Sequence, residues 1–395
     1  MRSLVVLGLT GWAMLGCSRE EAAPPAPAEA PAAPAKSAEL AAQARATAEA
    51  KTPSMSIEAY EALMLALGDC ALKVNGIDRE CPAWRAFDAA REARGVLLRE
   101  KTDELAALGR KHLTHANPAV RLQAARLTGS LFGASKESRG AVVAAAKVEK
   151  DPNALRAMLR VVRSSIGRAP EVQALLLSAA EHEDEQIRMT VYGALTARWA
   201  DGTEGTLERA LKAVEADPSA KVRRYVCRQL GDRADERALP LLEKLTAEPG
   251  KDDQLYAACF RGLIGMWASP VPHAKPSQAA YELTLARLNA KPRTAQSPPW
   301  AALANLEWAA KPELAANAPW FDKGALIAAL ADLAADRAAW WLARTTSVRV
   351  LSKLGAEPAV FKKLQAAYAE GVEPAGPDQH VRDEIAAQLA ADKAP

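Results

Sequence analysis

Apolar residues recur at helical spacing in five blocks of the central chain, and each block begins with Asp or Asn. The blocks read NPAVRLQAARLTGSL from Asn117, DPNALRAMLRVVRSSIG from Asp151, DEQIRMTVYGALTARW from Asp184, DPSAKVRRYVCRQLGDR from Asp217 and DDQLYAACFRGLIGMW from Asp252. Their starts are 34, 33, 33 and 35 positions apart, and such a fixed period indicates stacked supersecondary units. Asp and Asn are good N-caps and Pro is tolerated at the first helical position, so each start predicts a helix. Gly231 ends the fourth helix and a second apolar pattern follows, so each unit is expected to be a helical hairpin.

Helical patterning continues on both sides of the repeats. Residues 56–69 and 82–115 flank a cysteine-containing loop and are expected to form a cap that protects the open end of the stack. After a Pro-rich break at residues 268–277, further helices are expected near residues 276–290, 299–309, 321–335, 336–354, 358–369 and 378–391. β-Branched and aromatic residues are sparse and Ala is abundant, which favours helices over strands. The sequence therefore predicts an all-α, right-handed α-solenoid with a cap at 53–116, regular repeats at 117–267, and degenerate repeats with a C-terminal cap at 268–395.

The repeats carry a further signature, an apolar residue followed by Arg near each start, and the fourth block ends in LGDR at residues 230–233. In these features the region resembles the HEAT-repeat family, particularly the short bacterial type also found in phycobilin lyases. The resemblance implies a ladder between neighbouring units, built from these arginines and the residues at the helix starts. The implied ladder residues are Asn117, Arg121, Asp151, Arg156, Asp184, Arg188, Asp217 and Arg223. Asn117 carries no charge and Tyr256 replaces the fifth Arg, so the ladder is expected to be weak at its first unit and to stop at its fifth. Solvated surface arginines are the alternative.

The same resemblance implies that the second helix of each hairpin lines the concave face. Those helices are expected near residues 135–148, 170–180, 203–215 and 234–247. Their charges mix both signs, and this suits a specific protein partner better than a polyanion. Arg209 and Lys212 are therefore candidate interaction residues. The chain holds 51 basic and 48 acidic residues, a net charge of +3 without a basic run, which argues against nucleic-acid binding.

The first residues predict export and a lipid anchor. Residues 4–15 form an apolar stretch of signal-peptide length, shorter than the roughly 20 residues that a membrane-spanning helix needs. The stretch Met14-Leu15-Gly16-Cys17 resembles the lipobox of bacterial lipoproteins, which implies removal of residues 1–16 and lipid attachment to Cys17. Residues 17–52, rich in Pro and Ala, then form an expected tether. The implied location is the bacterial cell envelope, on the outer membrane facing the periplasm. A short transmembrane anchor is the alternative.

An exported chain meets an oxidising compartment, where cysteines close in sequence are normally bridged. Cys70 and Cys81 have ten residues between them, including the turn pair Asn75-Gly76, and are predicted to form a disulfide. Cys227 and Cys259 lie inside apolar helical patterns, which favours buried free thiols.

No motif of catalysis or cofactor binding is present. The sequence lacks a Gly-rich phosphate loop, GxSxG, HExxH and a Cys/His cluster at ligand spacing, so no catalytic residue, cofactor or metal site is predicted. His112 and His115 share a helix face, but a polar helix end explains them better than a metal. Five of the nine tryptophans fall between Trp300 and Trp341. Among them, Trp300 and Trp308 are candidates for an exposed interaction patch, with core packing as the alternative.

These observations favour a non-catalytic scaffold or adaptor that binds another envelope protein, because solenoids present long concave surfaces. A module that binds peptide or cell-wall glycan through the tryptophans is the second hypothesis. An enzyme related to the phycobilin lyases is the third, and it rests on the repeat resemblance alone. The expected contacts are a protein partner and a membrane reached through the N-terminal lipid.

Overall fold

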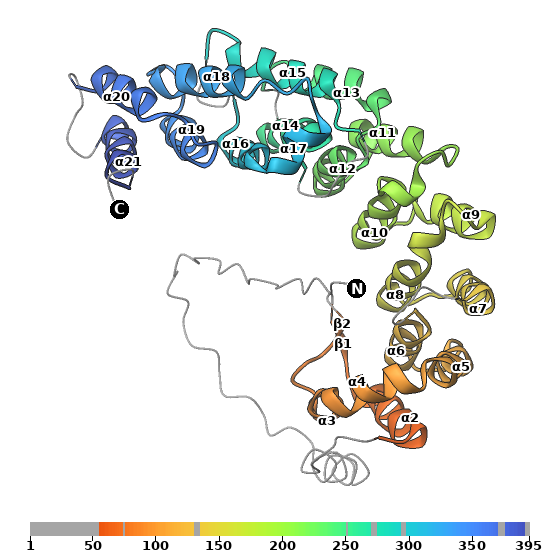
Figure 1. Cartoon of the computed structure of the whole chain (residues 1–395). Coiled ribbons are helices and arrows are strands. Elements are labelled where there is room, and N and C mark those ends of the chain that lie inside the picture. The colour runs from red at the N-terminus through yellow and green to blue at the C-terminus, as the bar shows by residue number, and fades with distance from the viewer. Residues whose placement is uncertain are drawn as a thin grey trace, which may run out of the picture.

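The computed structural model describes residues 55–73, 76–129, 135–249, 252–269, 275–293, 298–369 and 376–391. These residues form an all-α solenoid, an arc with one layer of helices inside and a second layer outside (Figure 1). Among the described helices, none combines the length and apolarity needed to cross a membrane. The predicted signal segment, Cys17 and the tether lie outside the described residues.

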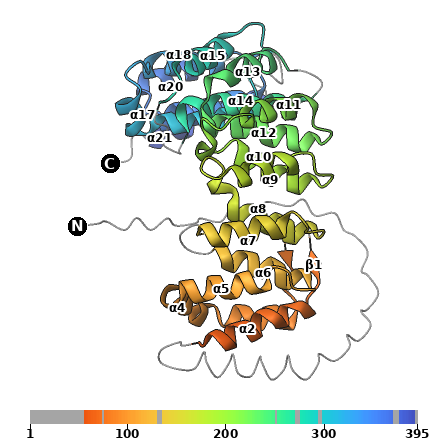
Figure 2. The ribbon, with the colours of Figure 1, turned by 90° about the vertical axis from the view of Figure 1, so that its right-hand side faces the viewer.

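The helices that begin the repeats form the inner layer. The inner helices are α6 (Pro118–Gly129), α8 (Pro152–Val162), α10 (Glu185–Leu195), α12 (Ala220–Arg233), α14 (Asp253–Ala268), α19 (Trp341–Lys353) and α21 (Pro377–Ala391). The outer helices are α5 (Thr102–His112), α7 (Lys136–Ala146), α9 (Pro170–Ala179), α11 (Thr206–Ala216), α13 (Leu239–Leu245), α15 (Gln278–Asn289), α18 (Lys323–Ala335) and α20 (Pro358–Ala367). Between α15 and α18 the chain forms α16 (Trp300–Leu303), the 3-10 helix η5 (Ala304–Ala310) and α17 (Pro312–Asn317). Figure 2 shows the helices stacked in sequence order from α5 to α10.

The expected assignment of the concave face is wrong. The second helices α7, α9, α11 and α13 lie outside the arc, and the helices that start with Asp or Asn line its inside (Figure 1). Inner neighbours such as α6 and α8 pack closely, whereas the outer neighbours α7 and α9 touch at few points. Small residues allow this close approach: a Cβ added to Gly129 would lie 2.6 Å from Cγ1 of Val161. Closer packing on one side of the stack bends it towards that side.

Polar side chains begin the inner helices, as the sequence predicted. Four of the five block-starting residues accept hydrogen bonds from main-chain N–H groups of the first turn: Asn117, Asp151, Asp184 and Asp252. The fourth block differs, because α12 begins after Ser219 and Asp217 lies two residues earlier. Asp217 accepts a bond from the Ser219 N–H at 2.8 Å and turns its carboxylate towards the preceding repeat.

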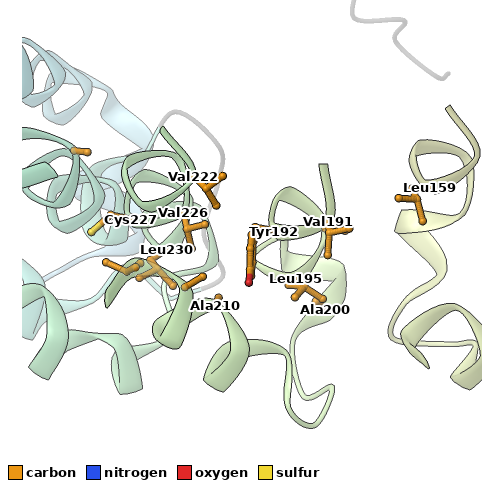
Figure 3. Close-up of a cluster of buried hydrophobic side chains, with 14 of the residues drawn as sticks. Leu159, Val191, Tyr192, Leu195, Ala200, Ala210, Val222, Val226, Cys227 and Leu230 are labelled. Carbon is orange, nitrogen blue, oxygen red and sulfur yellow. The ribbon is translucent and has the colours of Figure 1, made fainter. Parts of the chain in front are cut away.

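Apolar side chains from both layers fill the space between them. Figure 3 shows part of this core, to which α10, α11 and α12 contribute Val191, Tyr192, Leu195, Ala210, Val222, Val226 and Leu230. Each of these side chains is at most 4% exposed. The same core continues through the described chain from Tyr60 to Ile385. Each repeat therefore buries its apolar face against its neighbours, as expected of a solenoid.

The expectation of free thiols at Cys227 and Cys259 is also wrong. Both cysteines are fully buried, but a disulfide joins them across α12 and α14. They are 32 residues apart, almost one repeat period, so they occupy nearly equivalent positions of consecutive repeats. The two helices also meet backbone to backbone, because a Cβ on Gly262 would lie 2.3 Å from the carbonyl oxygen of Cys227.

The N-terminal cap contains the predicted disulfide between Cys70 and Cys81, with a Cα–Cα distance of 5.6 Å. It follows α2 (Ile57–Ala66) and the 3-10 helix η1 (Leu67–Asp69) and encloses the short antiparallel strands β1 (Leu72–Lys73) and β2 (Gly76–Ile77). The expected helix at 82–115 is divided into α3 (Pro82–Ala89), α4 (Arg91–Glu100) and α5. Buried Tyr60, Met64 and Leu67 close this end of the core.

Candidate interaction surface

The inter-repeat ladder forms in part, and its strongest rung joins α10 to the start of the next repeat. Arg188 donates from Nε and Nη2 to the two carboxylate oxygens of Asp217, both at 2.9 Å. Its Nη1 also donates to the carbonyl oxygens of His182 and Glu183. The hydrogen bonds that Arg188 donates to the Asp217 carboxylate raise the pKa of Arg188. A weaker rung follows, in which Arg223 lies 3.8 Å from Asp252.

The remaining implied pairs differ from expectation. Arg121 pairs with Glu149 at 2.6 Å rather than with Asp151, which caps α8. Arg156 donates to Asn153 of its own helix, and Asp184 caps α10. Asn117, besides capping α6, donates from Nδ2 to the Gly68 carbonyl oxygen at 2.7 Å and so ties the cap to the first repeat. These ladder residues connect neighbouring repeats and the cap.

Charged side chains on the outer layer largely neutralise one another between neighbouring repeats. The outer pairs are Arg139–Glu171 at 3.3 Å, Arg209–Glu181 at 2.6 Å, Arg237–Glu208 at 3.1 Å and Lys244–Glu215 at 2.9 Å. The predicted interaction residues Arg209 and Lys212 belong to α11 and therefore lie on the outer layer. They line a hollow of about 350 Å³ above the Arg188–Asp217 rung.

The inner helices α6, α8, α12 and α14, with the 3-10 turn after α8, carry a row of arginines that we call the arginine stripe. It consists of Arg126, Arg160, Arg163, Arg224, Arg228 and Arg261. Arg126, Arg160, Arg228 and Arg261 are exposed and the other two are half-buried. Within the described ranges, none of the six forms an ion pair with a carboxylate. Arg224 is hydrogen-bonded to Gln254, a neutral partner.

The first part of the stripe surrounds a hollow of about 370 Å³ between α6 and α8. Three arginines of the stripe line it together with Arg156, and Leu122 and Val161 contribute apolar surface. The indole of Trp199, 43% exposed, also lines it and lies 5.8 Å from the guanidinium carbon of Arg163. The hollow therefore offers cations above an apolar wall.

The second part lines a hollow of about 460 Å³ between α12 and α14. Arg224, Arg228 and Arg261 surround it, with Met189 and Ala257 among its apolar lining. The guanidinium carbon of Arg261 lies 5.7 Å from the ring centroid of Trp308. Both hollows thus combine arginines with apolar groups, and an aromatic ring lies near an arginine at each: Trp199 at the first and Trp308 at the second.

Tyr225 connects the two parts across α10. A Cβ on Gly193 of α10 would lie 2.5 Å from the Tyr225 hydroxyl, so any larger residue there would displace this ring from its present position. From α12, Tyr225 interacts electrostatically with Arg160 and Arg163 on one side and with Arg228 on the other. Tyr225 therefore joins the two groups of arginines across the third repeat, whose inner helix α10 contributes no arginine to the stripe.

The positive charges of the stripe repel one another. Loss of water around Arg126, followed by repulsion from Arg160 and Arg156, lowers the pKa of Arg126, although its side chain remains open to solvent. Loss of water and then repulsion from Arg261 lower the pKa of Arg228 in the same way. Arginine keeps its proton in proteins, so the consequence is a surface whose electrostatic free energy an anion would lower.

The other residues singled out from the sequence have separate surroundings. Trp300 is 40% exposed and packs edge-on against Trp340 at 6.2 Å, whereas Trp308 is half-buried beside the stripe. His112 lies 2.6 Å from Glu61, and His115 accepts a hydrogen bond from the Asn117 N–H. Among the described residues, no three His, Cys, Asp or Glu side chains gather as metal ligands.

The stripe could have been predicted from the sequence, because Arg recurs at the same position in several repeats. Three arginines of the stripe stand five positions after the ladder position of their repeat. They are Arg126 after Arg121, Arg228 after Arg223 and Arg261 after Tyr256. No basic run exists along the chain, because each repeat supplies only one or two of these arginines. Stacking of the repeats is what brings them together.

Comparison with known proteins supports the fold. The sequence matches no protein-family model and no curated protein. A solved structure described as Kap95p bound to RanGDP matches with a TM-score of 0.50 and 14% identity, over 85% of this chain and 45% of the other. The complex of CpcE and CpcF of phycocyanin lyase from Nostoc sp. PCC7120 matches with a TM-score of 0.34 and 15% identity, over 72% of this chain and 94% of the other. At these identities the likeness concerns the fold alone, and the chain spans less than half of the first neighbour. The protein is an all-α solenoid of HEAT-like helical repeats.

Proposed function

We propose that this protein is a non-catalytic scaffold or adaptor that binds another protein through its concave face. The observation that carries the proposal is the arginine stripe: it has no carboxylate partner among the described residues, whereas four ion pairs join neighbouring repeats on the outer layer. Unpaired, mutually repelling charges cost folding free energy, and proteins keep such features mainly where binding requires them. The fold supports this use, since solenoids commonly bind partners on their concave surfaces.

We further propose that the solenoid is held at a bacterial envelope membrane, on the outer membrane facing the periplasm, by lipid on Cys17. The support is the lipobox-like stretch before Cys17 and the Pro- and Ala-rich segment after it. Several acyl chains anchor a protein far more firmly than one chain does. The two disulfides fit an oxidising compartment.

Fractionation of cells tests the anchor. Cys17→Ser is expected to move the chain from the membrane fraction to the soluble fraction, because it removes the lipid attachment site. Cys17→Ser chain that stays membrane-bound after a salt wash, with residues 1–16 uncut, would instead favour a spanning N-terminal segment.

Crosslinking in intact membranes tests the scaffold role. The full chain is expected to trap a protein partner, and the partner is identified by mass spectrometry. Chains that carry Arg160→Gln and Arg228→Gln are expected to trap less of it, whereas Arg209→Gln on the outer layer serves as the control. Absence of any trapped protein under several crosslinker lengths would contradict the proposal.

A glycan- or peptide-binding role is the second candidate, and the exposed ring of Trp300 against Trp340 favours it. A peptidoglycan pull-down that depends on Trp300 and not on the arginine stripe would select this alternative. Aromatic faces bind sugars and peptide side chains without a need for charge.

A further inference from the structure

The arginine stripe restricts the chemistry of the partner, on the assumption that the proposed scaffold function is correct. Its cations are presented in two groups, each of three arginines, over the hollows between α6 and α8 and between α12 and α14. Guanidinium groups bind carboxylates in a planar, two-pronged geometry, which makes Arg the preferred residue for recognition of such groups. The partner surface must therefore supply anions at two places.

The surface between the arginines is apolar. The apolar lining of the first hollow consists of Leu122, Ala157 and Val161. That of the second includes Met189, Ala257 and Ala302. A ligand that fits both kinds of lining alternates anionic groups with small or apolar groups. Neighbouring side chains of an extended chain point to opposite sides, so a segment that alternates acidic with small or apolar residues presents carboxylates along one side and apolar groups along the other.

We propose that the arginine stripe binds an extended acidic segment of the partner protein, in which carboxylate side chains alternate with small or apolar residues. From α6 to α14 the stripe crosses four helix-to-helix steps of about 8–10 Å each, a path of about 35 Å. An extended chain advances about 3.3 Å per residue, so about eleven residues span the stripe. Carboxylates at each end of such a segment reach the two groups of arginines, and the middle crosses α10 over Gly193 and Tyr225.

A nucleic acid fits the same surface less well. Phosphates repeat uniformly along a strand, whereas the stripe is interrupted at α10, where Met189 and Gly193 carry no charge. Nucleic-acid affinity also depends on a broad basic footprint. Here the whole chain has a net charge of only +3, and on the outer layer four basic residues are paired with carboxylates.

The test measures binding of defined peptides to the full chain in detergent by fluorescence anisotropy. The probe is an extended peptide of about twelve residues that alternates Glu with Val, long enough to reach both hollows. Its control has Gln in place of every Glu. The Glu peptide is expected to bind at least about tenfold tighter than the Gln peptide, the loss expected for even one charge-assisted hydrogen bond. Equal binding of the two peptides would overturn the proposal.

Matched variants locate the binding site. Arg160→Gln and Arg228→Gln remove one exposed charge from each group, and each is expected to weaken Glu-peptide binding about tenfold. Arg209→Gln removes an outer-layer charge and is expected to change it less than about twofold. Circular dichroism and melting curves confirm that the variants are folded. Loss of binding in Arg209→Gln but not in the stripe variants would overturn the proposal.

Two further results separate this inference from the scaffold proposal. A single-stranded oligonucleotide that displaces the Glu peptide at equal concentration in physiological salt would identify the stripe as a nucleic-acid surface and overturn the inference. If the partner trapped in membranes is captured equally by wild type and by the doubly substituted Arg160→Gln, Arg228→Gln chain, the scaffold function stands but the stripe is not its docking site.

Discussion

At the scale of single residues, two roles that one acidic residue was expected to combine are performed by different residues: capping of the inner helix and pairing with the Arg of the preceding repeat. In the second repeat Asp151 caps α8, while Glu149, two residues earlier, pairs with Arg121. The Glu149 side chain is 2% exposed and accepts further hydrogen bonds from the main-chain N–H groups of Lys150 and Asp151. In the fourth repeat Asp217 takes the pairing role, and Ser219 begins the helix. Small shifts in register therefore decide which carboxylate connects two repeats.

The environment of Glu149 predicts a pH dependence. Burial opposes ionisation of its carboxyl group, but hydrogen bonds from Arg121 and from the Asp151 N–H outweigh burial and lower its pKa below the ordinary 4.5. A carboxyl whose pKa is lower in the folded state stabilises the fold above its ordinary pKa, and this contribution is lost as pH falls through the folded value. Glu149→Gln is expected to lower the free energy of unfolding by about 1–3 kcal/mol at neutral pH.

Urea unfolding of wild type and Glu149→Gln at several pH values measures this effect. The difference between them is expected to be full at neutral pH and to shrink below pH 4.5, as wild type loses its ionised carboxylate. A difference that stays constant through the acid range would show that packing, not ionisation, accounts for it.

At the scale of helices, spacing within the inner layer is set by glycines. Gly231 of α12 and Gly262 of α14 face each other so closely that a Cβ on Gly231 would lie 2.4 Å from the Gly262 carbonyl oxygen. The Cys227–Cys259 disulfide fixes the same contact covalently. Here two consecutive repeats form one rigid block, in which backbone atoms replace the usual side-chain packing.

Two glycine substitutions test this packing. Gly262→Ala is expected to destabilise the protein by about 1–3 kcal/mol or more, because the added methyl group meets backbone atoms that cannot rotate away. Gly140→Ala in α7 is the control: nothing lies within 4 Å of an added Cβ there. Alanine in an exposed helix is better than glycine by about 0.5–1 kcal/mol, so this variant is expected to be slightly more stable. Thermal melts that show equal effects for the two variants would rule out the backbone-to-backbone contact.

At the scale of the whole molecule, arginines without a carboxylate partner among the described residues gather on the inner helices. The outer pairs Arg209–Glu181 and Lys244–Glu215 join neighbouring helices, while the inner arginines repel one another. The net charge of +3 conceals this pattern, because it sums over both layers. Curvature adds to the effect, since the concave side brings the inner helices closer together (Figure 1).

This gathering of arginines predicts an unusual response to charge removal. The double variant Arg126→Gln, Arg228→Gln is expected to melt at a higher temperature than wild type at about 10 mM salt, where charges interact over about 30 Å. At about 1 M salt the screening length falls to about 3 Å and the difference is expected to vanish. Differential scanning calorimetry of the full chain measures both. A double variant that melts below wild type at low salt would show that the arginines stabilise the fold rather than strain it.

Much of the architecture is predictable from sequence because it depends on local and periodic signals. The period of 33 to 35 residues, the polar caps and the apolar spacing identify stacked hairpins, and the N-terminal disulfide follows from two cysteines in a short loop. The C-terminal helices were also predicted to within a few residues, for example α18 and α20. The contact between Cys227 and Cys259 was in principle readable as well, since a separation of one repeat places residues side by side.

The tertiary structure alone decides which layer is concave, and this decides which charges face a partner. Hairpin patterning is the same whichever helix lies inside the arc, so Arg209 and Lys212 were assigned to the wrong face. The direction of curvature results from unequal packing, through contacts such as Gly129 with Val161, that no single helix contains. The arginine stripe exists for the same reason: its members are distant in sequence, and stacking and curvature make them one surface.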